Sequence, residues 1–83
     1  MKNKIIEIIS DILRVDKKIV SENLNDYALG RVSGWDSLSH LAIMAEIEQY
    51  LDHELSIDEM EDLNSANKII EYVLEKNKSK NGL

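Results

Sequence analysis

Hydrophobic residues recur at helical spacing from the beginning of the chain. Residues 3–14 predict a first helix, although isoleucine is only a modest helix former. Its expected inward residues are Ile5, Ile6, Ile9, Ile12 and Leu13. A longer helix is predicted from Ser37 to Leu51, in the most strongly apolar part of the sequence. Asp36 is its expected N-cap, because a carboxylate there accepts from N–H groups that the first turn leaves unpaired.

Two further helices are predicted downstream. Ser56 and Glu59 fit a capping box for a short helix that ends near Leu63. Its inward contacts are expected to be Ile57 and Met60. Ser65 is the expected cap of a last helix, with Ile69, Ile70, Val73 and Leu74 inward and Tyr72 at the flank. The sequence therefore predicts an all-α fold: a four-helix bundle with a short third helix and a long loop between helices 1 and 2.

The long loop, residues 15–35, shows no sustained hydrophobic period. A short turn at residues 16–20 is its one candidate for regular structure. Because a loop of this length in a small domain must be held by side chains, we expect anchors at Val15, Ile19, Leu24, Tyr27 and Leu29. Tyr27 and Trp35 are also compatible with stacking on a ligand, but anchoring the loop is the favoured interpretation.

The helix at residues 37–51 carries two apolar stripes when its residues are placed about 100° apart. One stripe runs the length of the helix and predicts the core face: Ile43, Met44, Ile47 and Leu51, with Tyr50 at its edge. The other covers only the first two turns: Leu38, Leu41, Ala42 and Ala45. Apolar surface confined to the neighbourhood of one serine favours partner docking there. Packing of Leu38 and Leu41 under the preceding loop is the alternative.

Ser37 is the serine beside that second stripe. A nucleophilic serine would need a base, and the chain offers only His40 and His53. His40 is three residues away but leans toward the core stripe, and no nucleophile elbow or oxyanion hole is evident. We therefore expect no catalytic residue. The start of a helix suits a bound or attached phosphate instead, because unpaired N–H groups and the positive end of the helix dipole point there.

The tripeptide Asp36-Ser37-Leu38, with Gly34 before it and an amphipathic helix after it, resembles the attachment motif of the acyl carrier protein family. In that family a phosphopantetheinyl transferase moves 4′-phosphopantetheine from coenzyme A onto the serine. The resemblance covers residues 4–74 and includes the central position of the motif and the acidic residues downstream. It implies that Ser37 is the attachment point. It also implies that the surface around Ser37 docks partner enzymes; this docking set is Asp36, Leu38, Leu41, Ala45 and Glu48.

The sequence departs from the fatty-acid-synthesis members of the family. Ala42 and Gln49 stand where those members usually carry acidic residues, whereas Glu48 keeps its counterpart. The attachment motif at residues 34–41 is more similar to that of carriers in specialised pathways. The resemblance implies a discrete carrier that holds an acyl intermediate as a thioester and catalyses nothing itself. An aminoacyl or peptidyl carrier remains an alternative, as does an unmodified helical interaction module from a different class.

The formal net charge of −6 is concentrated in the middle of the chain. Residues 32–67 hold nine acidic residues and no Lys or Arg, whereas residues 1–31 hold six basic and five acidic residues. An acidic surface repels nucleic-acid phosphates and favours partners with basic patches, although it also serves solubility alone. The expected partners are the transferase, an acyl- or aminoacyl-loading enzyme and downstream acyl-processing enzymes.

Length and composition limit the remaining possibilities. The chain has 83 residues and no cysteine, which indicates one small domain whose thiol chemistry must come from an added group. Glu7 and Asp11 interrupt the first apolar run, so this run does not predict a signal peptide, and we expect a cytoplasmic protein without membrane insertion. We also expect a monomer. The polar stretch at 76–83 has nothing to bury, which predicts a helical domain at 1–75 and a flexible tail at 76–83.

No metal site is expected from the acidic residues. Asp52, Glu54 and Asp58 begin a pattern like a calcium-binding loop. However, Ile57 stands where that loop needs glycine, and Leu63 stands where it needs a bidentate glutamate.

Overall fold

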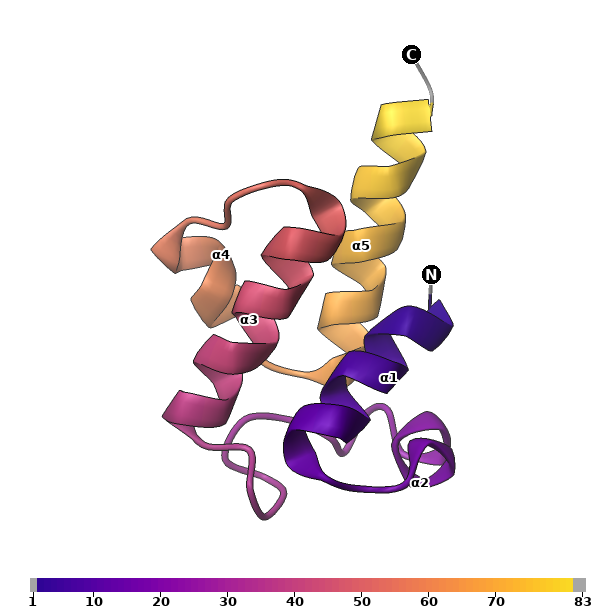
Figure 1. The fold of residues 1–83 in the computed structure, drawn as a ribbon, viewed down its shortest axis with the longest axis vertical. Helices are drawn as coiled ribbons and strands as arrows, with labels where there is room; N and C mark the ends of the chain where they lie inside the picture. Colours follow the sequence, from indigo (N-terminus) through magenta and orange to yellow (C-terminus); the bar gives the residue numbers. More distant parts are fainter. Residues whose placement is uncertain (1, 82–83) are drawn as a thin grey trace.

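Residues 2–81, which the computed structural model describes with side chains as far as Lys76, form five α-helices. These are α1 (Lys2–Leu13), α2 (Lys17–Glu22), α3 (Ser37–Leu51), α4 (Ile57–Asp62) and α5 (Ala66–Asn81). In Figure 1, α4 lies on the far side of α3 from α1, and α2 lies next to α1 at the end of the molecule opposite the last turns of α5. The all-α prediction and its four helices are confirmed. Helix α2 is an additional short helix within the long loop.

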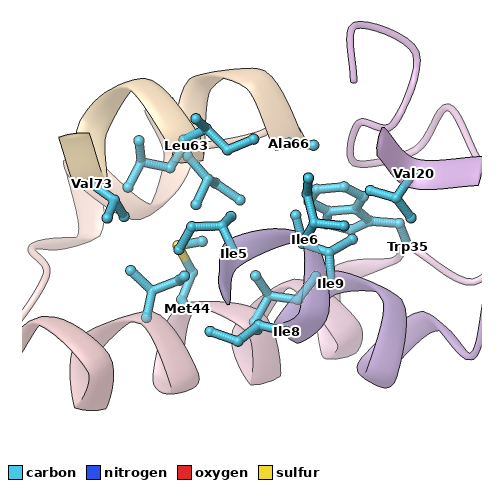
Figure 2. Packing of buried hydrophobic residues seen from close by; sticks show 14 of the residues in the cluster. Ile5, Ile6, Ile8, Ile9, Val20, Trp35, Met44, Leu63, Ala66 and Val73 are labelled. Atoms are coloured by element: carbon cyan, nitrogen blue, oxygen red, sulfur yellow. The ribbon is translucent and has the colours of Figure 1, made fainter. Parts of the chain in front are cut away.

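The core is built around α1, which packs against α2, α3 and α5. Ile5 and Ile9 are fully buried, and Figure 2 shows them beside residues contributed by the other elements. The predicted core stripe of α3 is confirmed, because its central residues are fully buried: Ile43, Met44 and Ile47. Helix α5 contributes buried side chains at Ile69, Ile70 and Val73. No helix within residues 2–81 is long and apolar enough to cross a membrane.

The first part of the long loop forms α2. Asp16 caps this helix, since its Oδ1 accepts from the Lys18 backbone N–H at 2.8 Å. Adjacent residues of a helix point about 100° apart, and α2 turns Val20 into the core and leaves Ile19 49% exposed. The prediction that Ile19 anchors the loop is therefore wrong. The other predicted anchors pack against the core as half-buried side chains: Val15, Leu24, Tyr27 and Leu29.

The second part of the loop is tied to the start of α5 by backbone hydrogen bonds. The Leu29 N–H donates to the Asn64 carbonyl and the Ala66 N–H donates to the Tyr27 carbonyl, each at 2.8 Å. Trp35 is 1% exposed, and Figure 2 shows its ring beside Val20. The loop that leads to Ser37 is thus fixed to both α2 and α5, and Trp35 is one of its anchors.

Two predicted inward residues lie on the surface instead. Ile57 is 73% exposed, because it is the first residue of α4 and borders an open cleft rather than the core. Leu74 is also exposed, at the margin of the α5 face that Ile69, Ile70 and Val73 bury. Helix α5 continues to Asn81, into the segment predicted as a flexible tail. Residues 82–83 of that segment lie outside the described residues, and its flexibility stays a prediction.

Candidate attachment and docking site

The loop-to-helix junction has the geometry predicted for it. Asp36 is extended, and its Oδ1 accepts from the Ser39 backbone N–H at 2.9 Å, so it is the N-cap of α3. This hydrogen bond holds the pKa of Asp36 below its ordinary value, because it favours the charged form of the carboxyl. Ser37 is the first residue of α3 and is exposed. Its hydroxyl therefore lies in solvent at the positive end of a helix of 15 residues.

Two exposed leucines follow Ser37 in the first turns of α3. Leu38 is 78% exposed and Leu41 is 58% exposed, so the alternative that both pack under the preceding loop is wrong. Beside them is an open cleft of about 310 Å³, lined by Leu29, Ser37, His40, Leu41, Ile57, Met60 and Glu61. Its lining is mostly apolar and comes from the long loop, α3 and α4. The cleft joins Ser37 to Ile57, which sequence reasoning had assigned to the core.

The rest of the predicted docking set lies farther along α3. Ala45 and Glu48 line a second hollow of about 420 Å³, together with residues 49 and 52–54. The Glu48 carboxylate accepts from the Leu55 backbone N–H at 2.8 Å, so it also stabilises the connection between α3 and α4. The structure therefore divides the docking set into a part beside Ser37 and a part near the C-terminal end of the helix. Sequence spacing gives no sign of the contact with Leu55, seven residues away.

His40 is not arranged as a base for Ser37. The indole Nε1–H of Trp35 donates to His40 Nδ1 at 3.0 Å, and His40 Nε2 lies 2.8 Å from the Met60 carbonyl oxygen. Both ring nitrogens are engaged by these partners, so neither is free to accept the proton of Ser37. The imidazole is 7% exposed, as its predicted leaning toward the core stripe implies.

Helix α4 is fastened to α5 by a charged hydrogen bond. The Tyr72 hydroxyl donates to Glu59 Oε2 at 2.7 Å, while Glu59 Oε1 accepts from the Ser56 N–H in the predicted capping box. These bonds, the one from Ser56 first, lower the pKa of Glu59 to about 2. Burial, and then the hydrogen bond to Glu59, raise the pKa of Tyr72. Among the described residues, no group of three or more acidic, His or Cys side chains is arranged to hold a metal ion.

Comparisons with known proteins show the family of the chain. Residues 3–73 match the family described as "Phosphopantetheine attachment site". The acyl carrier protein of Buchnera aphidicola subsp. Schizaphis graminum (strain Sg) is 35% identical over 78 residues, which span 94% of this chain and 95% of that protein. No solved structure matches the chain significantly.

The chain therefore belongs to the acyl carrier protein family, whose cofactor is a covalently attached 4′-phosphopantetheine arm. The residues present suit such an arm. An exposed hydroxyl at a helix N-terminus can carry a phosphodiester, and the adjoining surface is apolar. When attached, the arm supplies the thiol that this cysteine-free chain lacks.

Proposed function

We propose that Ser37 is the attachment point of the arm, and that the protein holds an acyl intermediate on it as a thioester and presents that intermediate to partner enzymes. The observation that carries this proposal is the exposed Ser37 hydroxyl at the start of α3, directly after the Asp36 cap. The carrier role requires no catalytic group on this chain. Its advantage is physical, because tethering raises the effective concentration of the cargo at each partner.

The partners belong to the same proposal. They are a phosphopantetheinyl transferase, a loading enzyme and acyl-processing enzymes of a specialised pathway. The apolar surface at Leu38, Leu41 and Ile57 would pack against such partners, and the acidic residues of α3 and α4 would pair with basic patches on them. Asp36, Ala45 and Glu48 complete the proposed docking surface. A cytoplasmic location and a monomeric state are also part of the proposal.

An intact-mass measurement tests the attachment point. Unmodified protein is incubated with coenzyme A, magnesium and a broad-specificity phosphopantetheinyl transferase. Wild type should gain the mass of one phosphopantetheine, whereas Ser37→Ala should gain none and keep its helical circular dichroism. Ser33→Ala and Ser39→Ala are matched controls, and both should still be modified. Modification of Ser37→Ala would refute the assignment, and an unchanged wild-type mass would favour an unmodified interaction module.

The cargo is tested separately, with the modified protein. We expect that an adenylating enzyme specific for carboxylic acids without an amino group loads the arm. An adenylating enzyme specific for amino acids should not load it. Loading with amino acids alone would identify an aminoacyl or peptidyl carrier and would leave the attachment point unaffected.

A further inference from the structure

His40 joins two elements that border the cleft beside Ser37. Its Nδ1 accepts from the indole of Trp35 in the long loop, and its Nε2 meets the carbonyl of Met60 in α4. The two rings meet at their edges through the hydrogen bond from the indole, with centroids 6.0 Å apart and an interplanar angle of 30°. Met60 is twenty positions from His40 in the sequence, so this contact holds α3 and α4 together.

The two partners determine where the imidazole carries its proton. An indole nitrogen can only donate, so Nδ1 must be unprotonated to accept from Trp35. A carbonyl oxygen can only accept, so Nε2 must carry the hydrogen that reaches Met60. His40 is therefore the neutral Nε2–H tautomer. Histidine fits this position because its rigid ring carries one acceptor and one donor on different edges.

The long loop at Trp35 and helix α4, which His40 joins, are held to the rest of the protein to different degrees. Trp35 is fully packed in the core and directly precedes Asp36, the cap of α3. Helix α4, in contrast, contains no buried residue in its six positions. Its side-chain and backbone links to the bundle include the His40 bond to Met60 and the Tyr72 bond to Glu59. The firmly held loop can therefore fix the position of α4 through the ring of His40.

We propose that His40 is a positioning residue that couples α4 to the Trp35 loop and so sets the shape of the cleft at Ser37. The consequence for modification of Ser37 rests on the proposed function, whereas the coupling itself does not. If α4 moves away from α3, the ring loses its Met60 partner and keeps only one of its two hydrogen bonds, the one from Trp35. Conversely, loss of the Trp35 bond frees the ring to tilt and loosens α4.

Two substitutions separate the hydrogen bonds. His40→Asn keeps an acceptor near the position of Nδ1 and removes the group that reaches Met60. His40→Gln can place an amide donor near the position of Nε2 and loses the acceptor for Trp35. The chain contains a second histidine, His53, which is exposed in the connection that follows α3. His53→Asn and His53→Gln are therefore matched controls.

Hydrogen exchange on the unmodified protein measures the coupling without reference to the arm. One reporter is the indole N–H of Trp35, the only tryptophan. The others, called the α4 amides, are the N–H groups of Met60 and Leu63, which donate to the carbonyls of Ser56 and Glu59 and close the turns of α4. In His40→Asn, the two α4 amides should exchange roughly tenfold faster, the size of effect expected for one lost hydrogen bond, while the indole changes little. In His40→Gln, the indole should exchange roughly tenfold faster, and the α4 amides should also accelerate by a few-fold.

The acceleration of α4 in His40→Gln is the decisive result, because that variant keeps a donor for Met60. Unchanged α4 amides there would show that the two bonds act independently and would overturn the proposal. Equal acceleration of amides in α1 would also overturn it, since that would indicate general destabilisation. The nitrogen chemical shifts of the wild-type imidazole should show the Nε2–H tautomer. The opposite tautomer would contradict the assigned bonds.

The rate of Ser37 modification then tests the link to function. Both His40 variants should be modified a few-fold more slowly than wild type. If exchange shows the coupling and all variants are modified equally, His40 positions α4 without affecting the cleft, and that part of the proposal fails. If wild type is not modified at all, the proposed function fails and the exchange result still decides the coupling.

Discussion

The Tyr72 hydroxyl donates to the Glu59 carboxylate at 2.7 Å and fastens the short helix α4 to α5. The pKa of Glu59 is lowered from its ordinary 4.5 to about 2 by the N–H of Ser56 and then by this hydroxyl. A carboxyl with a lowered pKa stabilises the fold in its ionised form. Its contribution is therefore complete above about pH 5 and is lost as the pH falls through 4.5 toward 2.

Tyr72→Phe should consequently make the free energy of unfolding depend less on pH in the acid range. The variant should be less stable than wild type near neutral pH, and the difference should shrink as the pH falls from 5 toward 2. Chemical denaturation at a series of pH values measures this difference. Tyr50→Phe is the control, because Tyr50 is exposed on α3. A Tyr72→Phe deficit that stays constant with pH would show that the hydroxyl does not act through the charge of Glu59.

The two stripes of α3 should separate stability from docking. Ile47 is fully buried, so Ile47→Ala should lower the free energy of unfolding by about 2–5 kcal/mol through lost burial and the cavity left behind. Leu41 is largely exposed, and Leu41→Ala should cost no more than about 0.5 kcal/mol while slowing modification by the transferase. Denaturant titrations and modification rates of both variants provide the measurements. Equal destabilisation by the two substitutions would mean that Leu41 belongs to the core.

Local patterns predicted much of the fold and of the site. The Asp36 cap and the capping box of Ser56 and Glu59 depend on residues three apart, and both are present. The core face of α3 followed from its helical period over 15 residues. Such a period is informative because several turns must agree on one buried direction.

Features that depend on distant parts of the chain could not be predicted in the same way. Helix α4 has only six residues, so its period did not reveal that Ile57 borders a cleft. The Met60 carbonyl that His40 meets is a backbone group and has no residue signature. Likewise, the backbone ties from Tyr27 and Leu29 to the start of α5 join segments far apart in sequence. Residue type and spacing carry no information about such contacts.

Glu48 should contribute to stability through its contact with Leu55. Glu48→Ala leaves the N–H of Leu55 without its carboxylate partner, and Leu55 is buried, so we expect a loss of about 1–3 kcal/mol. Glu48→Gln retains an amide oxygen that can accept from the same N–H and should cost clearly less. Thermal or denaturant unfolding of the two variants measures the difference. Equal losses would show that the negative charge, rather than the hydrogen bond, stabilises the connection between α3 and α4.

The acidic surface of α3 should steer basic partners, and salt dependence distinguishes steering from solubility. Glu48→Gln removes the charge at a proposed docking residue while keeping the Leu55 contact, whereas Glu75→Gln removes a charge from the exposed part of α5. A single exposed ion pair contributes only about 0–1 kcal/mol, so each substitution should change the affinity at most a few-fold.

The association rate is more sensitive to charge than the affinity, because an electric field that acts over about 8 Å at physiological ionic strength reaches farther at low salt. Glu48→Gln should therefore lower both the association rate with the transferase and its dependence on salt, and Glu75→Gln should change neither to the same extent. Stopped-flow association at several salt concentrations is the measurement. Identical salt dependences of the two variants would mean that total charge alone matters and that Glu48 has no special part in docking.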